Sequence, residues 1–525
     1  MRDLHLPGRS PVLAENGLCA TSHPLVAKLA VDMLERGGNA VDAAIAGAMV
    51  LNVCEPHMTG LGGDCFVLFT GPGGSDLRGL NGSGRAPAAA SAADLRARGH
   101  ETVPLRGAEA VTMPGAVDAF CRLSADHGRM GLDAVLAPAI RYAEAGVPVA
   151  PRVAFDWPTA GQALQGHGLT HFTRSGEPLK TGDIFCAPGQ AEVLRRIARE
   201  GRDGFYTGEV ADDMLAALRQ AGGVHTAEDF AAVACDYTDP VAGEYAGVEL
   251  VEHPPNGQGA TAILLLNILS HFDIKAMDPL GAERIHIEAE ATKLAYDARN
   301  RFIADPDRTA RLEHMLAPET AARLAALIDP KRAMPAAASL TEAVHRDTVY
   351  ITVVDRDRMA VSLIYSLYHG FGSGIASERF GILLQNRGAG FNLTPGHPNE
   401  MEGGKRPMHT IIPAMLRRGG KVFMPFGVMG GAYQPEGHAR FVSNLRDFGM
   451  SPQAAIDAPR SFADAGVLKL ERGYDPAVGR ELAAMGHEIT VPDAPLGGAQ
   501  AIMIHDSGVL EGGSDSRKDG CALGY

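Results

Sequence analysis

The chain has 525 residues, 46% of them hydrophobic, and a net charge of −14 at pH 7. This length suggests two to four domains, and the acidic balance disfavours nucleic acid or an anionic membrane surface as the main partner. The seven cysteines are scattered without a CxxC pair, no apolar signal segment opens the chain, and no apolar stretch is long enough to cross a bilayer, so we expect a cytoplasmic protein.

The first two thirds of the chain read mainly as helices. Residues 24–53 predict two helices, the first ended by Gly37 and Gly38 and the second capped by Asn39. CFVLF, residues 65–69, predicts a strand that is entered through GLGGD. Further helical stretches are predicted at residues 106–148, 190–232 and 283–302.

Two stretches of this part resemble ligand sites. GLGGD, residues 60–64, lies between a helix and a strand, whereas a dinucleotide loop follows a strand and opens a helix. We therefore expect close backbone packing or a substrate-facing loop there. His286 and Glu290 stand four residues apart on a predicted helix, but no further ligand pattern accompanies them. A capped or salt-bridged helix face is the expectation, with no metal and no other cofactor.

The last third is rich in predicted strands. Residues 329–347 carry proline, small residues and mixed charge, which predicts an exposed flexible segment. VYITVV and MAVSLIYSLY follow as a β-hairpin, and IIPAML, KVFMPFGV and AIMIH continue as strands. Helices first and strands last predict a layered α+β protein whose sheets join distant parts of the chain.

Thr348 opens the hairpin directly after this flexible segment. A threonine hydroxyl needs a base within hydrogen-bond reach to act as a nucleophile. Its own α-amine, with a pKa of about 7.7–8.0, can serve once the Asp347–Thr348 bond is cut. A β-branched residue that merely begins a strand is the competing interpretation.

Motifs along nearly the whole chain favour the nucleophile. They include HPLVAKLAVDMLERGGNAVDAAIAGAMVLNVCEPHMTGLGGDCFVLF, PPNGQGATAILLLNIL, DTVYITVVDRDRMAVSLIYSLYHGFGSG, KRPMHTIIPAML and GVMGGAYQPEGH. These motifs, in this order, resemble the γ-glutamyltransferase family. The resemblance implies an N-terminal-nucleophile hydrolase with a four-layer αββα sandwich. It also implies a precursor that cuts itself between Asp347 and Thr348, giving a large subunit, 1–347, and a small one, 348–525, that interleave in one sandwich.

The same resemblance assigns a catalytic half of the site. Thr348 corresponds to the nucleophile that forms an acyl-threonine intermediate. Gly430 and Gly431 correspond to the glycines whose N–H groups form the oxyanion hole, where each donor contributes roughly 3 kcal/mol. Ser366 corresponds to a hydroxyl beside the nucleophile, and Asn386 to an asparagine near the cleft.

The glutamate-recognition half departs from the family pattern. Ser83 stands where an arginine would hold the substrate's α-carboxylate, and Arg85 is displaced by two residues. The positions that would hold the α-ammonium are Tyr368, Arg387 and Gly390, and the usual serine pair is His409 and Thr410. An ammonium group would then face Arg387 without an anionic partner, so we expect glutamyl compounds to be poor substrates.

The residues that replace the family's glutamate-binding residues suit a different substrate. Arg387 with Tyr368, His369 and His409 fits a small carboxylate, which arginine can bind with two hydrogen bonds. The segment between Phe391 and Lys405 looks shorter than the family's lid loop, so the pocket is either more open or covered by another element. This pattern is similar to the branch of the family that includes oxamate amidohydrolase.

The sequence therefore predicts a self-processing amidohydrolase that acts on a small carboxylate-bearing amide. Two alternatives remain: a γ-glutamyl hydrolase or transferase with an altered pocket, and an unprocessed binding protein that keeps the fold. Hydrolysis and transfer are not separated by any motif. The expected partners are the two subunits of one precursor, as a heterodimer or a dimer of heterodimers, and the substrate.

Overall fold

The computed structural model describes His5, residues 8–334 and residues 346–525. Two seven-stranded antiparallel sheets form its centre. One sheet consists, in spatial order, of β19 (Cys521–Gly524), β2 (Leu18–Thr21), β10 (Arg346–Val354), β11 (Ala360–His369), β3 (Asp64–Phe69), β4 (Arg78–Gly82) and β7 (Asp236–Thr238). The other consists of β1 (Val12–Ala14), β18 (Leu510–Ser514), β17 (Gly498–Ile504), β13 (Lys421–Met429), β12 (Ala414–Arg418), β9 (Val248–Glu252) and β8 (Val241–Tyr245).

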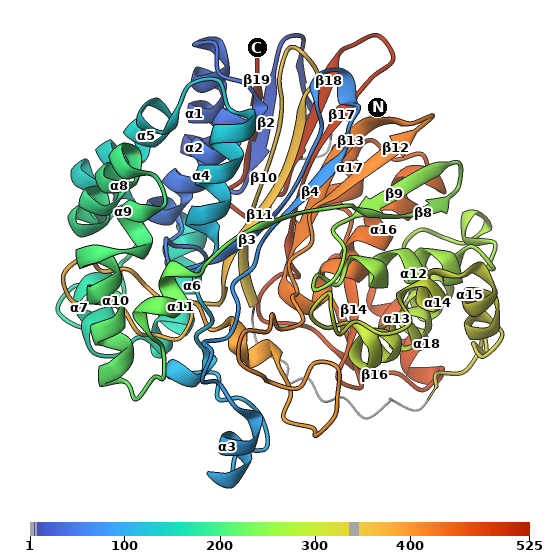
Figure 1. Cartoon of the computed structure of the whole chain (residues 1–525). Helices are drawn as coiled ribbons and strands as arrows, with labels where there is room; N and C mark the ends of the chain where they lie inside the picture. Colours follow the sequence, from blue (N-terminus) through green and yellow to red (C-terminus); the bar gives the residue numbers. More distant parts are fainter. Residues whose placement is uncertain (1–4, 6–7, 335–345) are drawn as a thin grey trace.

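Helices cover the outer face of each sheet, as Figure 1 shows. The β10 sheet is covered mainly by α1 (Pro24–Glu35), α2 (Ala40–Cys54), α4 (Ala116–His127), α5 (Leu132–Ala145), α8 (Pro188–Glu200) and α10 (Gly208–Gln220). The β13 sheet is covered by α12 (Gly259–Leu269), α13 (Ala282–Phe302), α15 (Pro318–Ala325), α16 (Gln434–Arg446) and α17 (Pro452–Asp457). The remaining α-helices of the described residues are α3 (Ala92–Ala97), α6 (Pro151–Ala160), α7 (His167–Phe172), α9 (Asp203–Tyr206), α11 (Ala227–Ala231), α14 (Leu312–Leu316) and α18 (Pro476–Ala484).

Three apolar cores separate these four layers. One lies between the β10 sheet and its helices, and a second between the β13 sheet and its helices. The third lies between the two sheets and includes Leu18, Leu68, Met415 and Ile502. Helix α2 is buried on all sides and opens with a capping box of Asn39 and Asp42, which satisfies its first backbone N–H groups.

The chain order confirms a mixed helix and strand fold with antiparallel sheets that join distant segments. β10 and β11 form the predicted hairpin, yet their neighbours β2 and β3 come from the first 70 residues. Small sheets of β14 (Ser461–Asp464), β15 (Val467–Leu470) and β16 (Glu488–Thr490), and of β5 (Val147–Pro148) and β6 (Ile184–Phe185), lie outside the two large ones. Across the described residues, no helix combines the length and the apolar character that a membrane span requires.

Two strand boundaries differ from the sequence prediction. β10 begins at Arg346, so it runs through the Asp347–Thr348 bond instead of starting after it. The flexible segment predicted for residues 329–347 falls in part on residues 335–345, outside the described residues. IIPAML forms a strand only from Ala414, because Pro413 has no N–H for the ladder and Ile412 instead donates its N–H to Gln434 Oε1.

Candidate functional site

Thr348 lies on β10, an interior strand of its sheet, opposite a bulge in β11. Asp347 pairs with Tyr368 and Val349 with Tyr365, so Thr348 alone faces two residues, Ser366 and Leu367. Such a bulge bends the strand and redirects side chains. The Thr348 hydroxyl, 2% exposed as a residue, donates to Ser366 Oγ at 3.4 Å, and the same oxygen accepts the N–H of Tyr368 at 2.7 Å. The structure thus brings together the predicted nucleophile and its predicted neighbour.

Gly430 and Gly431 form a turn between β13 and α16. Both have positive φ angles, +121° and +58°, which glycine adopts without strain. The turn continues as η6 (Gly431–Tyr433), which contacts β10. Met429 also shares a buried cluster with Tyr350, two residues after Thr348. The predicted oxyanion glycines therefore lie near the start of the strand that carries Thr348.

Gln258 connects this turn with the rest of the site, and sequence reasoning missed it. The side chain is fully buried, and its Nε2 donates to Gly431 O at 2.9 Å and to Thr410 O at 2.6 Å. Its Oε1 accepts from Arg299 Nη1 at 2.8 Å. One amide therefore fixes both the glycine turn and the Thr410 backbone.

The predicted ligand-binding residues gather around Asp64, a second residue that the sequence analysis did not select. Arg387 donates to both carboxylate oxygens of Asp64 at 3.1 Å and to Thr410 Oγ1 at 3.2 Å. His409 Nε2 lies 2.7 Å from Asp64 Oδ2, and Asp64 and Ser366 are paired residues of β3 and β11. The cluster is therefore one ladder step from the residue that contacts Thr348.

This geometry corrects one expectation. Arg387 does not present an unopposed positive charge, because the buried carboxylate of Asp64 neutralises it. Burial raises the pKa of Asp64, but the charge of Arg387 and the hydrogen bonds from His409 and Arg387 outweigh burial, so that pKa lies below its ordinary value. A charged residue at the entrance of the otherwise apolar strand DCFVLF was the signal available in the sequence.

His409 is neutral at pH 7 in this cluster. Burial, and then the nearby Arg387 charge, lower its pKa to about 4. Its Nδ1 accepts the N–H of Ile411 at 3.2 Å, so Nε2 carries the proton and donates it to Asp64. Arg387 and Asp64 are therefore the two charges of the group.

Tyr368 and His369 extend the cluster toward Asn386. The Tyr368 ring lies 4.2 Å from the Arg387 guanidinium carbon, and its φ of +82° is strained for a residue with a side chain. Asn386 accepts the N–H of His369 at 3.1 Å and lies 2.9 Å from His369 Nδ1. Asn386 also donates to Leu105 O at 2.9 Å, so it holds His369 against the 103–110 segment.

Arg85 is the one predicted binding residue whose contacts lie elsewhere. It is half-exposed and bonds Gly404 O at 3.0 Å, with Asp305 at 3.5 Å. Ser83 accepts a hydrogen bond from Asn256 Nδ2 at 3.0 Å and has no positive charge to offer a carboxylate. The structure thus gives no contact between Arg85 and the Asp64 group.

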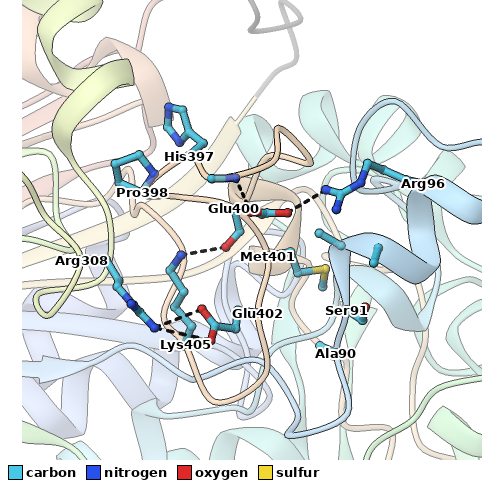
Figure 2. Close-up of a pocket in the computed structure, with 13 residues that line it drawn as sticks. Ala90, Ser91, Arg96, Arg308, His397, Pro398, Glu400, Met401, Glu402 and Lys405 are labelled. Atoms are coloured by element: carbon cyan, nitrogen blue, oxygen red, sulfur yellow. Dashed lines mark hydrogen bonds and ion pairs between the residues drawn. The ribbon is translucent and has the colours of Figure 1, made fainter.

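The short segment after Phe391 packs against α3. Phe391, Leu393 and Met401 share a small apolar core with Leu95 of this helix. Arg96 also bonds Glu400 at 2.7 Å, and a cavity of about 450 Å³ opens between the two elements (Figure 2). None of the residues predicted to act in catalysis or binding lines this cavity.

His286 and Glu290 lie on one face of α13, as predicted, and Glu290 forms an ion pair with Lys293 at 2.6 Å. The predicted helix face thus carries a salt bridge. The structure adds His487, which no sequence spacing brings near them: its Nε2 lies 2.8 Å from His286 Nδ1.

Comparison with known proteins agrees with this architecture. A sequence model described as gamma-glutamyltranspeptidase matches residues 26–525. The chain is 35% identical to a glutathione hydrolase-like YwrD proenzyme of Bacillus subtilis and 34% identical to an oxamate amidohydrolase proenzyme of Klebsiella pneumoniae. Each alignment covers 98% of this chain and 99% of the relative.

A cephalosporin acylase structure from Bacillus halodurans superposes with a TM-score of 0.92 at 37% identity, over 100% of this chain and 98% of that one. The chain therefore belongs to the gamma-glutamyltranspeptidase family, and the resemblance drawn from its motifs is confirmed.

Proposed function

We propose that this member of the gamma-glutamyltranspeptidase family is an N-terminal-nucleophile amidohydrolase that cuts itself between Asp347 and Thr348. The observation that carries the proposal is the hydrogen bond from Thr348 to Ser366, at a bulge beside the Gly430–Gly431 turn. A purely structural threonine needs neither a buried hydroxyl partner nor a glycine turn at that position. Relatives named as proenzymes support the self-cutting step.

The self-cut begins when Thr348 Oγ1 attacks the carbonyl carbon of Asp347. A C–O bond forms, the Asp347–Thr348 C–N bond breaks, and the hydroxyl proton passes to the departing nitrogen, which becomes the new α-amine. Water then cleaves the ester and leaves a free hydroxyl on Thr348. We assign to Ser366, which accepts the hydrogen bond of Thr348, the role of orienting the hydroxyl in this step, and to the N–H groups of Gly430 and Gly431 the role of stabilising the oxyanion.

Turnover of an external amide repeats the chemistry. The α-amine of Thr348 takes the hydroxyl proton as the oxygen attacks, and returns it to the amine that leaves. An acyl-threonine ester results, and water, or an acceptor amine in a transfer reaction, releases the acyl group. The cut chain is expected to remain one body, because β10 pairs on both sides, with β2 and with β11, while the segment before it belongs to the large fragment.

For substrate, we infer an amide of a small carboxylate. Arg387 uses three of its five N–H groups on Asp64 and Thr410, which leaves two for a ligand within the described contacts. Tyr368 lies beside it and His369 follows, and in the uncut chain the two residues pair with Asp347 and Arg346. Release of those two residues from the ladder would uncover the proposed binding residues. The oxamate amidohydrolase relative supports this substrate class.

Asp64 favours a second candidate, a γ-glutamyl hydrolase. It supplies a buried carboxylate next to Arg387, so an α-ammonium group would not lack an anionic partner. A glutathione hydrolase proenzyme of Escherichia coli is 32% identical over 98% of this chain. In the first candidate Arg387 binds the carboxylate of the substrate, and in the second Asp64 binds its α-ammonium group.

One series of assays tests both. Purified wild type and Thr348→Ala are followed on a denaturing gel with N-terminal sequencing, and then assayed with oxamate, a γ-glutamyl anilide and a neutral amide of similar size. We expect two fragments for wild type, the smaller beginning at Thr348, and a single chain for the variant. Faster turnover of oxamate supports the first candidate, and faster turnover of the anilide the second. A wild-type chain that stays intact and turns over neither would refute the proposal and favour the unprocessed binding protein.

A further inference from the structure

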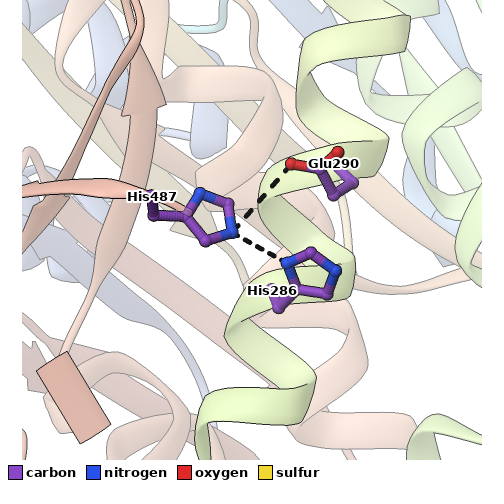
Figure 3. A group of neighbouring side chains, drawn as sticks. All are labelled: His286, Glu290 and His487. Atoms are coloured by element: carbon purple, nitrogen blue, oxygen red, sulfur yellow. Dashed lines mark hydrogen bonds and ion pairs between the residues drawn. The ribbon is translucent and has the colours of Figure 1, made fainter. Parts of the chain in front are cut away.

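We propose that His286, Glu290 and His487 form a binding site for a divalent metal ion, with Zn²⁺ as the ion that the ligand set fits best. The three side chains are buried, and their ligand atoms all lie within 4.8 Å of one another. His286 and Glu290 come from one face of α13, and His487 from the turn between α18 and β16 (Figure 3). None of them contacts the Thr348 cluster among the described residues.

Backbone groups orient two of the three ligands. His286 Nε2 donates its proton to Asp329 O at 2.8 Å, because a carbonyl can only accept. The lone pair of its Nδ1 therefore points at His487 Nε2, 2.8 Å away. A histidine that donates its second N–H to a carbonyl is the usual outer arrangement of a metal ligand.

A backbone group also orients the carboxylate of Glu290. Glu290 Oε2 accepts the N–H of Met334 at 2.7 Å, and Oε1 lies 4.0 Å from His487 Nε2. A tetrahedral Zn²⁺, bound at about 2.0–2.2 Å by nitrogen and oxygen, needs its ligand atoms about 3.3 Å apart. Two of the observed separations, 2.8 and 4.0 Å, bracket that value, and all three pairs lie within 4.8 Å, so an ion would have to draw the ligand atoms together by side-chain rotation.

The chemistry of the donors selects the ion. Two imidazoles and one carboxylate suit Zn²⁺, whereas Ca²⁺ and Mg²⁺ prefer oxygen ligands alone. Three protein ligands leave a fourth position for water. One positive group opposes the ion: Lys293 Nζ lies 2.6 Å from Glu290 Oε1 and has to share or release that oxygen.

The metal-free alternative is a satisfied hydrogen-bond group. In it, His487 donates Nε2–H to His286 Nδ1, and Lys293 alone neutralises Glu290. Both arrangements fit a 2.8 Å separation of the nitrogens, so measured metal content has to decide between them.

The position of the site suggests what the ion does, and this part rests on the proposed self-cut. His286 and Glu290 belong to the large fragment and His487 to the small one. The backbone partners Asp329 and Met334 stand just before the undescribed segment that leads to the cut. Ala333 also donates its N–H to Met485 O at 2.8 Å. A metal ion here would join the large fragment, through α13 and residues 329–334, to the small fragment at His487.

The test uses the full chain without a histidine tag, stripped with a chelator and then equilibrated with Zn²⁺ alone. Metal content is measured by mass spectrometry, and affinity by competition with a coloured chelator. We expect about one Zn²⁺ per chain, both in wild type and in the uncut Thr348→Ala variant. Because the uncut variant is included, failure of the self-cut and failure of the metal site are distinguishable.

Four variants locate the ion. His487→Ala and Glu290→Gln should each weaken Zn²⁺ binding by at least about tenfold, since even outer partners of metal ligands contribute that much. Lys293→Gln should bind at least as tightly as wild type, because a competing cation is gone. His505→Ala is the matched control, a histidine paired with Glu511 in another sheet, and should bind as wild type does.

Two results would overturn the proposal. One is a wild-type chain that takes up no stoichiometric Zn²⁺; the other is undiminished affinity in both His487→Ala and Glu290→Gln. For the joining role, cut wild type should keep its fragments together at a higher urea concentration with Zn²⁺ than with chelator. Equal midpoints would show that the ion does not join the fragments.

Discussion

The ion pair between Arg387 and Asp64 is the part of the site whose role is most open to measurement. Replacing Arg387 by alanine removes two charged hydrogen bonds and leaves the Asp64 carboxylate fully buried, with His409 as its remaining side-chain partner. Breaking one side of a buried ion pair costs about 3–5 kcal/mol of stability. The variant therefore loses stability, whatever its role toward the substrate.

The catalytic contribution has to be separated from that loss. A hydrogen bond from Arg387 to a substrate carboxylate contributes about 2–3 kcal/mol, as bonds to charged groups do, which is about 30- to 150-fold in kcat/KM. A neutral amide of the same size loses none of this contact. We expect kcat/KM of Arg387→Ala to fall by that factor for the carboxylate substrate, and by less than about threefold for the neutral one.

The matched control removes both charges. Asp64→Asn with Arg387→Gln leaves no uncompensated ion, so its thermal midpoint should lie above that of Arg387→Ala while the carboxylate substrate stays poor. The assays are initial rates on both substrates and thermal unfolding of the three proteins. Equal losses of kcat/KM on the charged and the neutral amide would refute a carboxylate-binding role and leave Arg387 as a purely structural partner of Asp64.

Three further predictions concern the turn, the buried histidine and the sheet interface. Gly430→Ala should lower kcat by about 100-fold or more and slow the self-cut, because its φ is +121° and a Cβ would stand 3.0 Å from Gly497 Cα; normal kcat would contradict the oxyanion role. His409 has a pKa of about 4, below its ordinary 6.5, so the stability it confers is complete above pH 6.5 and falls by about 3 kcal/mol toward pH 4. Between pH 6.5 and pH 4 the urea midpoint of His409→Asn should fall less than that of wild type, and an identical dependence of the two midpoints on pH would exclude the effect. Gly427→Ala should cost about 1–3 kcal/mol, since its Cβ would lie 2.3 Å from the Tyr350 ring; an unchanged thermal midpoint would contradict this packing argument.

Elements set by local pattern follow from the sequence alone. Helix α2 begins at its predicted cap, Asn39, and α13 covers the predicted residues 283–302 with one residue added. Thr348 could be selected from a motif, because the chemistry of an N-terminal nucleophile fixes the kind of residue and its place at a strand. Ser366 and the glycine turn followed from the same family motifs.

The residues that sequence reasoning missed act across long separations. Asp64 meets Arg387 over 323 positions, and His487 meets His286 over 201. Gln258 reaches the glycine turn over 173 positions. No periodicity encodes such contacts, since they arise only when two sheets and their helices are stacked. The net charge around a residue depends on such distant partners. The sequence therefore predicts Arg387 as a cation without an anionic partner, whereas the structure pairs it with Asp64.

The start of β10 is another feature that the sequence does not predict, and it bears on the proposed mechanism. A strand that started after Thr348 would leave the cleavage site in a loop, open to any protease. In the structure, Arg346 and Asp347 pair with His369 and Tyr368, so the bond lies inside a sheet that also contains its nucleophile. A bond paired in a sheet is poorly placed for an external protease, whereas the hydroxyl of Thr348 belongs to the residue next to that bond. The register thus favours the proposed cut made by the chain on itself, after which Arg346 and Asp347 would no longer be joined to Thr348.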